Sequence, residues 1–149
     1  MKWLVKEEPE NYSYAQFLKD GTTVWAGVKN PVAQRNLRSM KKGDRVFFYH
    51  TGKEKAVIGT ATVSVPAYPD PKDKTGSLVV VELSAGKALK RPVTLAEIKA
   101  DKRFASMPLV RIPRLSVQPV TDDEWEMIEA IDRELLDATA RWDLLDSIG

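Results

Sequence analysis

Residues 22–50 read TTVWAGVKNPVAQRNLRSMKKGDRVFFYH, a stretch with the signals of a strand, a helix and a second strand. The β-prone run Thr22–Trp25 predicts a short strand. Asn30-Pro31 is an N-cap followed by a first-turn proline, so a helix is expected to begin there and to run to about Met40. Asp44–His50 is a dense run of apolar and aromatic residues, which predicts a second strand. A strand, a helix and a strand therefore follow one another with short connections.

The flanking sequence adds further short strands and helices. The remaining predicted strands are Lys2–Lys6, Ala56–Val65, Leu78–Leu83 with an irregular extension to Leu89, and Arg111–Val120. The last of these belongs at a sheet edge because it contains two prolines. Capping boxes predict helix starts at Ser13 to Gln16, Thr94 to Glu97 and Thr121 to Glu124. The strands do not alternate regularly with long helices, which argues against a doubly wound sheet. We predict a twisted or barrel-like α+β domain.

Charge divides the chain into a basic body and an acidic end. Residues 1–120 contain 21 lysines and arginines and 11 acidic residues, a net charge of +10. Residues 121–149 contain 2 basic and 10 acidic residues, a net charge of −8. A body this basic favours polyanionic partners, because each neutralised phosphate releases condensed counterions.

The composition excludes several classes of protein. The chain has no cysteine, which excludes disulfides, zinc–thiolate sites and thiol nucleophiles. Residues 1–9 contain too few apolar side chains before charge returns to form a signal peptide or a membrane span. We therefore expect a cytoplasmic protein that is stabilised by packing alone.

Motifs of common enzymes are absent. The single histidine, His50, cannot form a two-histidine metal site, and the sequence has no G-x-S-x-G motif and no phosphate-binding glycine motif. A lone histidine can act as a general base, but it usually needs an orienting partner. We predict a binding protein that uses no metal, no cofactor and no catalytic residue.

Three aromatic residues favour base binding. Trp25, Tyr49 and Tyr68 lie at predicted strand ends or in loops, beside glycine, proline, asparagine and lysine. An aromatic ring next to cations suits a nucleobase, since stacking contributes about 1–3 kcal/mol per base. Tyr49 and Phe48 should face opposite sides of their strand. The alternative for each aromatic residue is ordinary core packing. Polar candidates for reading a base edge are Asn30, Asn36, Ser116 and Gln118.

Several stretches, in a fixed order, resemble the EVE domain, a member of the PUA-like superfamily. They are WLVKEEP (Trp3–Pro9), TTVWAGVKNPVAQRNLRSMKKGD (Thr22–Asp44), VFFYHTG (Val46–Gly52), AYPDP (Ala67–Pro71), LKRPVTLAEIKAD (Leu89–Asp101) and RLSVQPVTDDEW (Arg114–Trp125). The resemblance implies a PUA-like mixed β-barrel with short peripheral helices. It divides the chain into an EVE domain, residues 1–131, and an acidic helical extension, residues 132–149.

The resemblance also implies a function. PUA and YTH domains bind RNA, and EVE domains are regarded as readers of modified bases, particularly modified cytosines in DNA. The expected partner is therefore DNA or RNA with a single modified base held in an aromatic and polar pocket. Carried over by position, the pocket consists of Trp25, Tyr49 and His50 with a polar wall of Lys6, Asn30, Ser116 and Gln118. The cations expected at its rim, as phosphate contacts, are Lys29, Arg35, Arg38, Arg111 and Arg114.

Two other functions stay open at this point. One is a nucleotide-directed enzyme with His50 as general base, and the other is a protein-interaction module that acts through the acidic C-terminal helix. The base-reader hypothesis requires the rings of Trp25 and Tyr49 to flank one slot, so burial of both rings with no opening between them would exclude this pocket. Replacement of Trp25 by alanine is expected to abolish base-dependent binding and to leave the fold intact.

Overall fold

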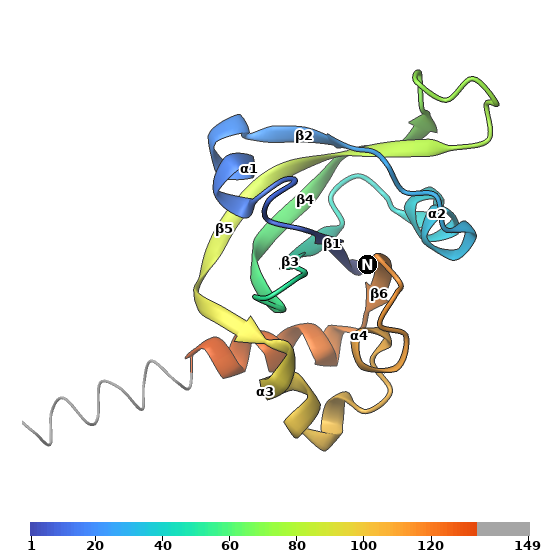
Figure 1. The fold of residues 1–149 in the computed structure, drawn as a ribbon. Coiled ribbons are helices and arrows are strands. Elements are labelled where there is room, and N and C mark those ends of the chain that lie inside the picture. Colours follow the sequence, from blue (N-terminus) through green and yellow to red (C-terminus); the bar gives the residue numbers. More distant parts are fainter. Residues whose placement is uncertain (134–149) are drawn as a thin grey trace, which may run out of the picture.

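Six strands form one mixed sheet in the order β2-β5-β4-β3-β1-β6 in the computed structural model, which describes residues 1–133 (Figure 1). The strands are β1 Lys2–Glu7, β2 Thr22–Trp25, β3 Arg45–His50, β4 Ala56–Pro69, β5 Val79–Thr94 and β6 Val117–Val120. The pair β1 and β3 is parallel, and the other neighbouring strands are antiparallel. The predicted α+β class is confirmed.

Short helices follow the capping signals in the sequence. They are α1 Tyr14–Asp20, α2 Pro31–Ser39, α3 Leu95–Ala100, the 3-10 helix η1 Lys102–Phe104 and α4 Pro108–Arg111, and residues 122–133 are also helical. The side chains of Ser13, Asn30 and Thr94 accept hydrogen bonds from the first backbone amides of α1, α2 and α3. In the third predicted capping box, Thr121 and Glu124 each accept a hydrogen bond from the other's backbone amide. No helix within residues 1–133 is long and apolar enough to cross a membrane.

The sheet curves strongly but does not close into a barrel, so the barrel expectation holds only loosely. Its edge strands, β2 and β6, do not pair with each other. Helix α2 lies between the two ends of the sheet (Figure 1). Gln34 exchanges hydrogen bonds with the backbone of Val79 in β5, and Asn36 donates one to the carbonyl oxygen of Val117 in β6. This helix therefore replaces the strand pairing that a closed barrel would have.

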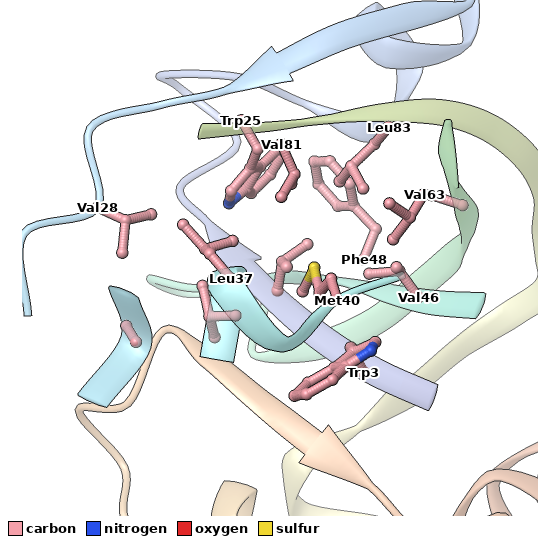
Figure 2. Packing of buried hydrophobic residues seen from close by; sticks show 14 of the residues in the cluster. Trp3, Trp25, Val28, Leu37, Met40, Val46, Phe48, Val63, Val81 and Leu83 are labelled. Atoms are coloured by element: carbon pink, nitrogen blue, oxygen red, sulfur yellow. The ribbon is translucent and has the colours of Figure 1, made fainter. Parts of the chain in front are cut away.

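Two hydrophobic cores cover the two faces of the sheet. The first core lies under α1 and α2 and is shown in part in Figure 2; its larger members are Trp3, Tyr14, Phe17, Trp25, Leu37, Phe48 and Leu83. The second core lies under α3, α4 and the helix at residues 122–133; its larger members are Leu4, Phe47, Tyr49, Ile98, Phe104, Met107, Trp125 and Ile128. Successive residues of β3 alternate between the two cores, as the period of a strand requires. The prediction that Phe48 and Tyr49 face opposite sides is confirmed.

Three strands differ from their predicted bounds by more than one residue. β4 continues past its predicted end at Val65 to Pro69. β5 is one continuous strand to Thr94, whereas the sequence predicted a strand over Leu78–Leu83 with an irregular extension to Leu89. The predicted strand over residues 111–120 shortens to β6, because α4 and a turn occupy the segment before it. β6 does lie at the edge of the sheet, as its prolines predicted.

The residues at the predicted boundary between body and extension are helical. Asp132 is buried, and its carboxylate accepts hydrogen bonds from the backbone amides of Lys90 and Arg91 in β5. These bonds fasten the helix at residues 122–133 to the sheet. Residues 134–149, most of the predicted acidic extension, lie outside the described part of the chain, so the domain division stays a prediction.

The ion pair of Arg91 and Glu97 predicts a loss of stability in acid. The guanidinium of Arg91, with the backbone amide and hydroxyl of Thr94, lowers the pKa of Glu97 from 4.5 to about 2. A carboxylate whose pKa is depressed on folding stabilises the protein above the unfolded pKa, and this contribution is lost as the pH falls through the folded one. We expect urea denaturation of the wild type to show an extra loss of up to about 1 kcal/mol between pH 4.5 and pH 2, a value discounted for partial exposure.

The matched variants are Glu97→Gln and, as a control, Glu10→Gln in an exposed turn. The Glu97→Gln protein should be less stable than the wild type at neutral pH and should lose less stability on acidification. The control should follow the wild type at each pH. An identical pH dependence for Glu97→Gln and the wild type would show that this ion pair does not stabilise the fold.

Candidate functional site

Trp25 lies at the exit of β2 and is packed into the first core. Its ring meets Phe48 edge to face, with 5.4 Å between ring centroids, and only 5% of the residue is exposed. Its indole N–H has no hydrogen-bond partner within residues 1–133 and is not completely buried. The ring is therefore a core side chain whose N–H is left without a hydrogen bond in the described part of the chain.

Tyr49 lies on the opposite face of the sheet from Trp25. It belongs to the second core and is 3% exposed, whereas its neighbour Phe48 packs against Trp25 in the first core. The sheet itself separates the two rings. The predicted slot between Trp25 and Tyr49 is therefore wrong. Phe48, which contacts Trp25, and Tyr49 are adjacent residues of β3 and so face opposite sides of the sheet.

His50 is a structural residue in this fold. Its Nε2 accepts a hydrogen bond from the backbone amide of Tyr14 at 3.0 Å, which leaves the ring proton on Nδ1. Nδ1 lies 2.5 Å from Oε2 of Glu54, and the side chain is buried. Both ring nitrogens are occupied, so the placement of His50 in a base pocket is corrected. The same bonds leave no nitrogen free for a general base.

Ser116 and Gln118 do not face Trp25 either. Gln118 is completely buried on the second-core side, where its Nε2 donates to the carbonyl oxygen of Leu115 and its Oε1 has no partner within residues 1–133. Ser116 contributes its backbone carbonyl, which accepts a hydrogen bond from the amide of Lys6. The predicted polar wall is thus divided between the interior and the sheet edge.

The segment between β2 and α2 does carry several predicted residues together. Asn30 caps α2 through its Oδ1, which accepts from the amides of Val32 and Ala33, and its Nδ2 has no partner within residues 1–133. Lys29 and Arg35 are exposed and make no ion pair in that range. Arg38, also exposed, donates to the carbonyl oxygen of Ser77 in the loop before β5, at 2.6 Å. Three of the five predicted rim cations therefore lie on α2 or on the segment between Trp25 and α2.

Gln34 is a positioning residue that the sequence prediction missed. It is buried, and its Nε2 donates to the carbonyl oxygens of Val28 at 2.7 Å and Val79 at 3.1 Å. Its Oε1 accepts the amide of Val79, so one side chain holds the segment after Trp25 against β5. The signal was its helical spacing: Gln34 stands three residues before the inward Leu37.

Lys6 and Tyr49 are the two predicted pocket residues that meet. Lys6 Nζ lies 5.6 Å from the centroid of the Tyr49 ring and donates to the carbonyl oxygen of Pro113. Both line a cavity of about 240 Å³ on the second-core side. Arg111 and Arg114, the remaining rim residues, are exposed on either side of Pro113.

A second hollow, of about 770 Å³, contains none of the predicted site residues. It runs along the helix at residues 122–133, and its lining mixes Arg103 and Arg133 with the carboxylates of Asp123, Glu124 and Glu126. Such mixed charge does not single out one class of ligand. Within residues 1–133 no group of three or more metal-ligating side chains comes together.

Comparison with known proteins places these features in a family. The model of the EVE domain matches residues 1–131. Human thymocyte nuclear protein 1 is 28% identical over an alignment of 166 positions, which covers 89% of this chain and 74% of the human protein. Its name describes no enzymatic reaction.

Solved structures have the same fold. A protein from Rhodopseudomonas palustris is 43% identical, with a TM-score of 0.85 over 90% of this chain and 94% of that one. The human THYN1 protein, solved in complex with DNA that contains 5-methylcytosine, is 29% identical, with a TM-score of 0.80 over 88% of this chain and 96% of that one. The family model covers most of the chain, and these relatives share its fold and much of its length. The chain therefore belongs to the EVE domain family.

Proposed function

We propose that this chain binds nucleic acid and recognises a single modified base, without catalysing a reaction on it. The observation that carries the proposal is the solved complex of the human THYN1 protein with DNA containing 5-methylcytosine. That structure aligns with 88% of the length of this chain. The basic body, with a net charge of +10 over residues 1–120, is suited to a polyanion.

The base site proposed here is the N–H edge of Trp25. Because the ring is packed against Phe48, the base would meet its N–H edge rather than be sandwiched between two rings. The indole N–H of Trp25 and the Nδ2 of Asn30, which is unpaired within residues 1–133, are both donors, which suits acceptor atoms on a base edge. Gln34 keeps this segment in place, so the donors are ordered before the ligand arrives.

Phosphate contacts are assigned to the cations that follow this segment. Lys29 and Arg35 are exposed, and neither is paired with a carboxylate within residues 1–133. Contacts of this kind hold a strand in register but carry no sequence information. They should make the affinity depend on salt, with a slope of about −0.9 in log–log form for each phosphate neutralised on duplex DNA.

The two alternative functions have weaker support. Catalysis by His50 is not favoured, because Tyr14 and Glu54 occupy both ring nitrogens. A protein-interaction role for the acidic extension concerns residues that, apart from 132 and 133, lie outside the described part of the chain. The cytoplasmic location inferred from composition likewise stays a prediction.

The test is a binding titration of the full chain against oligonucleotides that differ in one methyl group. Duplex and single-stranded oligonucleotides, each with one 5-methylcytosine or the matched cytosine, are titrated at two salt concentrations. We expect the methylated oligonucleotide to bind about fivefold more tightly, the value of one buried methyl group, and this ratio should survive the higher salt. Affinity for both oligonucleotides should fall as salt increases.

Two variants separate the base contact from the phosphate contacts. Trp25→Phe keeps a ring against Phe48 but removes the indole N–H. It should weaken binding of both oligonucleotides and leave the salt slope unchanged, because cytosine and 5-methylcytosine present the same acceptor atoms. The double variant Lys29→Gln, Arg35→Gln should weaken both equally and reduce the salt slope. If the two oligonucleotides bind equally at both salt concentrations, the chain contacts only the backbone and the base-reading proposal is wrong.

A further inference from the structure

The cavity beside Tyr49 lies on the face of the sheet opposite Trp25. It forms where the ends of β1 and β3 meet α3 and the segment before β6, and its volume is about 240 Å³. Its lining is Lys6, Tyr49, Thr51, Gly52, Lys55, Leu95, Lys99, Leu109 and Pro113. The base site proposed above uses none of these residues.

Three lysines and no carboxylate line this cavity. Lys6 comes from β1, Lys55 from the turn between β3 and β4, and Lys99 from α3. Lys55 and Lys99 are exposed and make no ion pair within residues 1–133. The nearest acidic group on that turn, Glu54, is bonded to His50. Glu54 also lines a neighbouring hollow together with Lys55 and Lys99, but it does not line the cavity itself, whose charged side chains are all lysines.

The fold holds these lysines in place by backbone contacts. The carbonyl oxygen of Lys55 accepts a hydrogen bond from the amide of Leu95 at 2.8 Å, and Lys55 is the one non-glycine residue in the described range with a left-handed φ, 43°. Lys99 stands one helical turn after Leu95, so both point from the same face of α3. Lys6 is tied to the carbonyl oxygen of Pro113 at 2.7 Å.

Tyr49 provides a neutral donor in the cavity wall. Its hydroxyl has no hydrogen-bond partner within residues 1–133 and is not completely buried. Burial raises the pKa of Tyr49 to about 12, so the hydroxyl keeps its proton at neutral pH. The cavity thus presents O–H and ammonium donors and a rim of apolar side chains.

The chemistry of these donors suits a compact anion that accepts several hydrogen bonds. Like charges brought together repel one another unless an anion lies between them, and an oxyanion accepts from several donors at once. The cavity is smaller than the roughly 300–1,000 Å³ of typical small-molecule sites, which suits a phosphate group rather than a whole nucleotide.

We propose that this cavity binds a phosphate group, held by Lys6, Lys55 and Lys99 and by a hydrogen bond from the Tyr49 hydroxyl. The phosphate belongs either to the backbone of a nucleic-acid strand or to a small phosphate ester. The proposal does not depend on the base site at Trp25, because the two sites lie on opposite faces of the sheet.

The first experiment uses inorganic phosphate as the probe. The ¹⁵N-labelled full chain is titrated with sodium phosphate and, at matched ionic strength, with sodium chloride. Saturable amide shifts around residues 49–55 and 95–99 are expected with phosphate alone. Lys55→Gln, Lys99→Gln and Tyr49→Phe should each weaken binding, by about fivefold for each lysine. Lys19→Gln, an exposed lysine on α1, should bind as the wild type does.

The second experiment separates the two sources of phosphate. The salt dependence of oligonucleotide binding is measured for the wild type, for the double variant Lys55→Gln, Lys99→Gln and for Lys19→Gln. A smaller salt slope in the double variant alone identifies strand phosphate, whereas an unchanged slope with lost phosphate shifts identifies a small phosphate ester. If phosphate and chloride give the same spectra and the slope is also unchanged, the proposal is overturned. The preference for methylated oligonucleotides is measured in parallel and should not change, so failure of this site is distinguishable from failure at Trp25.

Discussion

Replacement of Trp25 by alanine is expected to destabilise the folded protein by about 3–5 kcal/mol, the usual cost of removing a buried tryptophan. The ring is 5% exposed and packs edge to face on Phe48, so the substitution leaves a cavity in the first core. This corrects the expectation from sequence that alanine would remove base-dependent binding and leave the fold intact. Urea denaturation of the variant measures the loss.

The matched control for Trp25→Ala is Val24→Ala. Val24 precedes Trp25 on β2 and is 49% exposed, so its truncation should cost less than about 1 kcal/mol. Similar losses in the two variants would mean that Trp25 is not packed as described. Loss of binding in Trp25→Ala therefore cannot identify the base site, and Trp25→Phe is the informative variant.

Gly59→Ala is expected to destabilise the protein by at least about 2 kcal/mol, in the range found for overpacked cores. A Cβ at Gly59 would lie closer than 3.0 Å to several ring atoms of Tyr14. That ring cannot move freely, because its hydroxyl donates to the carbonyl oxygen of Thr60 and accepts from its amide. Gly59 lies where the register of β4 shifts, a common place for glycine inside a strand. Thermal and urea denaturation measure the effect.

A double-variant cycle tests the cause of this loss. In a Tyr14→Leu background the crowding ring is absent. Adding Gly59→Ala there should lower the free energy of unfolding by less than about 0.5 kcal/mol relative to Tyr14→Leu alone. Thr62→Ala, at an exposed position of the same strand, is the control and should change stability by less than about 0.5 kcal/mol. An equal cost of Gly59→Ala in both backgrounds would assign the loss to the backbone rather than to Tyr14.

The local structure was largely predictable because its signals are local. N-caps at Ser13, Asn30 and Thr94 and the prolines of the edge strand act within a few residues, and each predicted element exists. The bounds of β5 were not predictable, because its second half has little apolar character and is held by pairing with β4. Strand pairing between distant segments leaves no local trace in one sequence.

The site was harder to predict for a similar reason. Trp25, Tyr49 and His50 were grouped because each stands at a strand end, but strand ends on opposite faces of a sheet do not form one pocket. The sequence does show that Phe48 and Tyr49 face opposite sides of their strand. It does not show that Trp25 packs on Phe48, and without that contact Trp25 and Tyr49 could not be assigned to opposite faces of the sheet. Pairing of Lys55 with α3 depends on a backbone hydrogen bond between segments that are far apart in sequence.

Recognition of a base at Trp25 is tested most directly by the indole N–H resonance of Trp25 during an oligonucleotide titration. In residues 1–133 the other indoles are held in the core: that of Trp3 donates to Asp44, and that of Trp125 is buried. The Trp25→Phe spectrum assigns the resonance. A base bound at this edge should shift the Trp25 signal strongly with a 5-methylcytosine oligonucleotide, less with the unmethylated control, and leave the signal of Trp3 in place. A stationary Trp25 resonance at saturating oligonucleotide would contradict recognition of the base at Trp25.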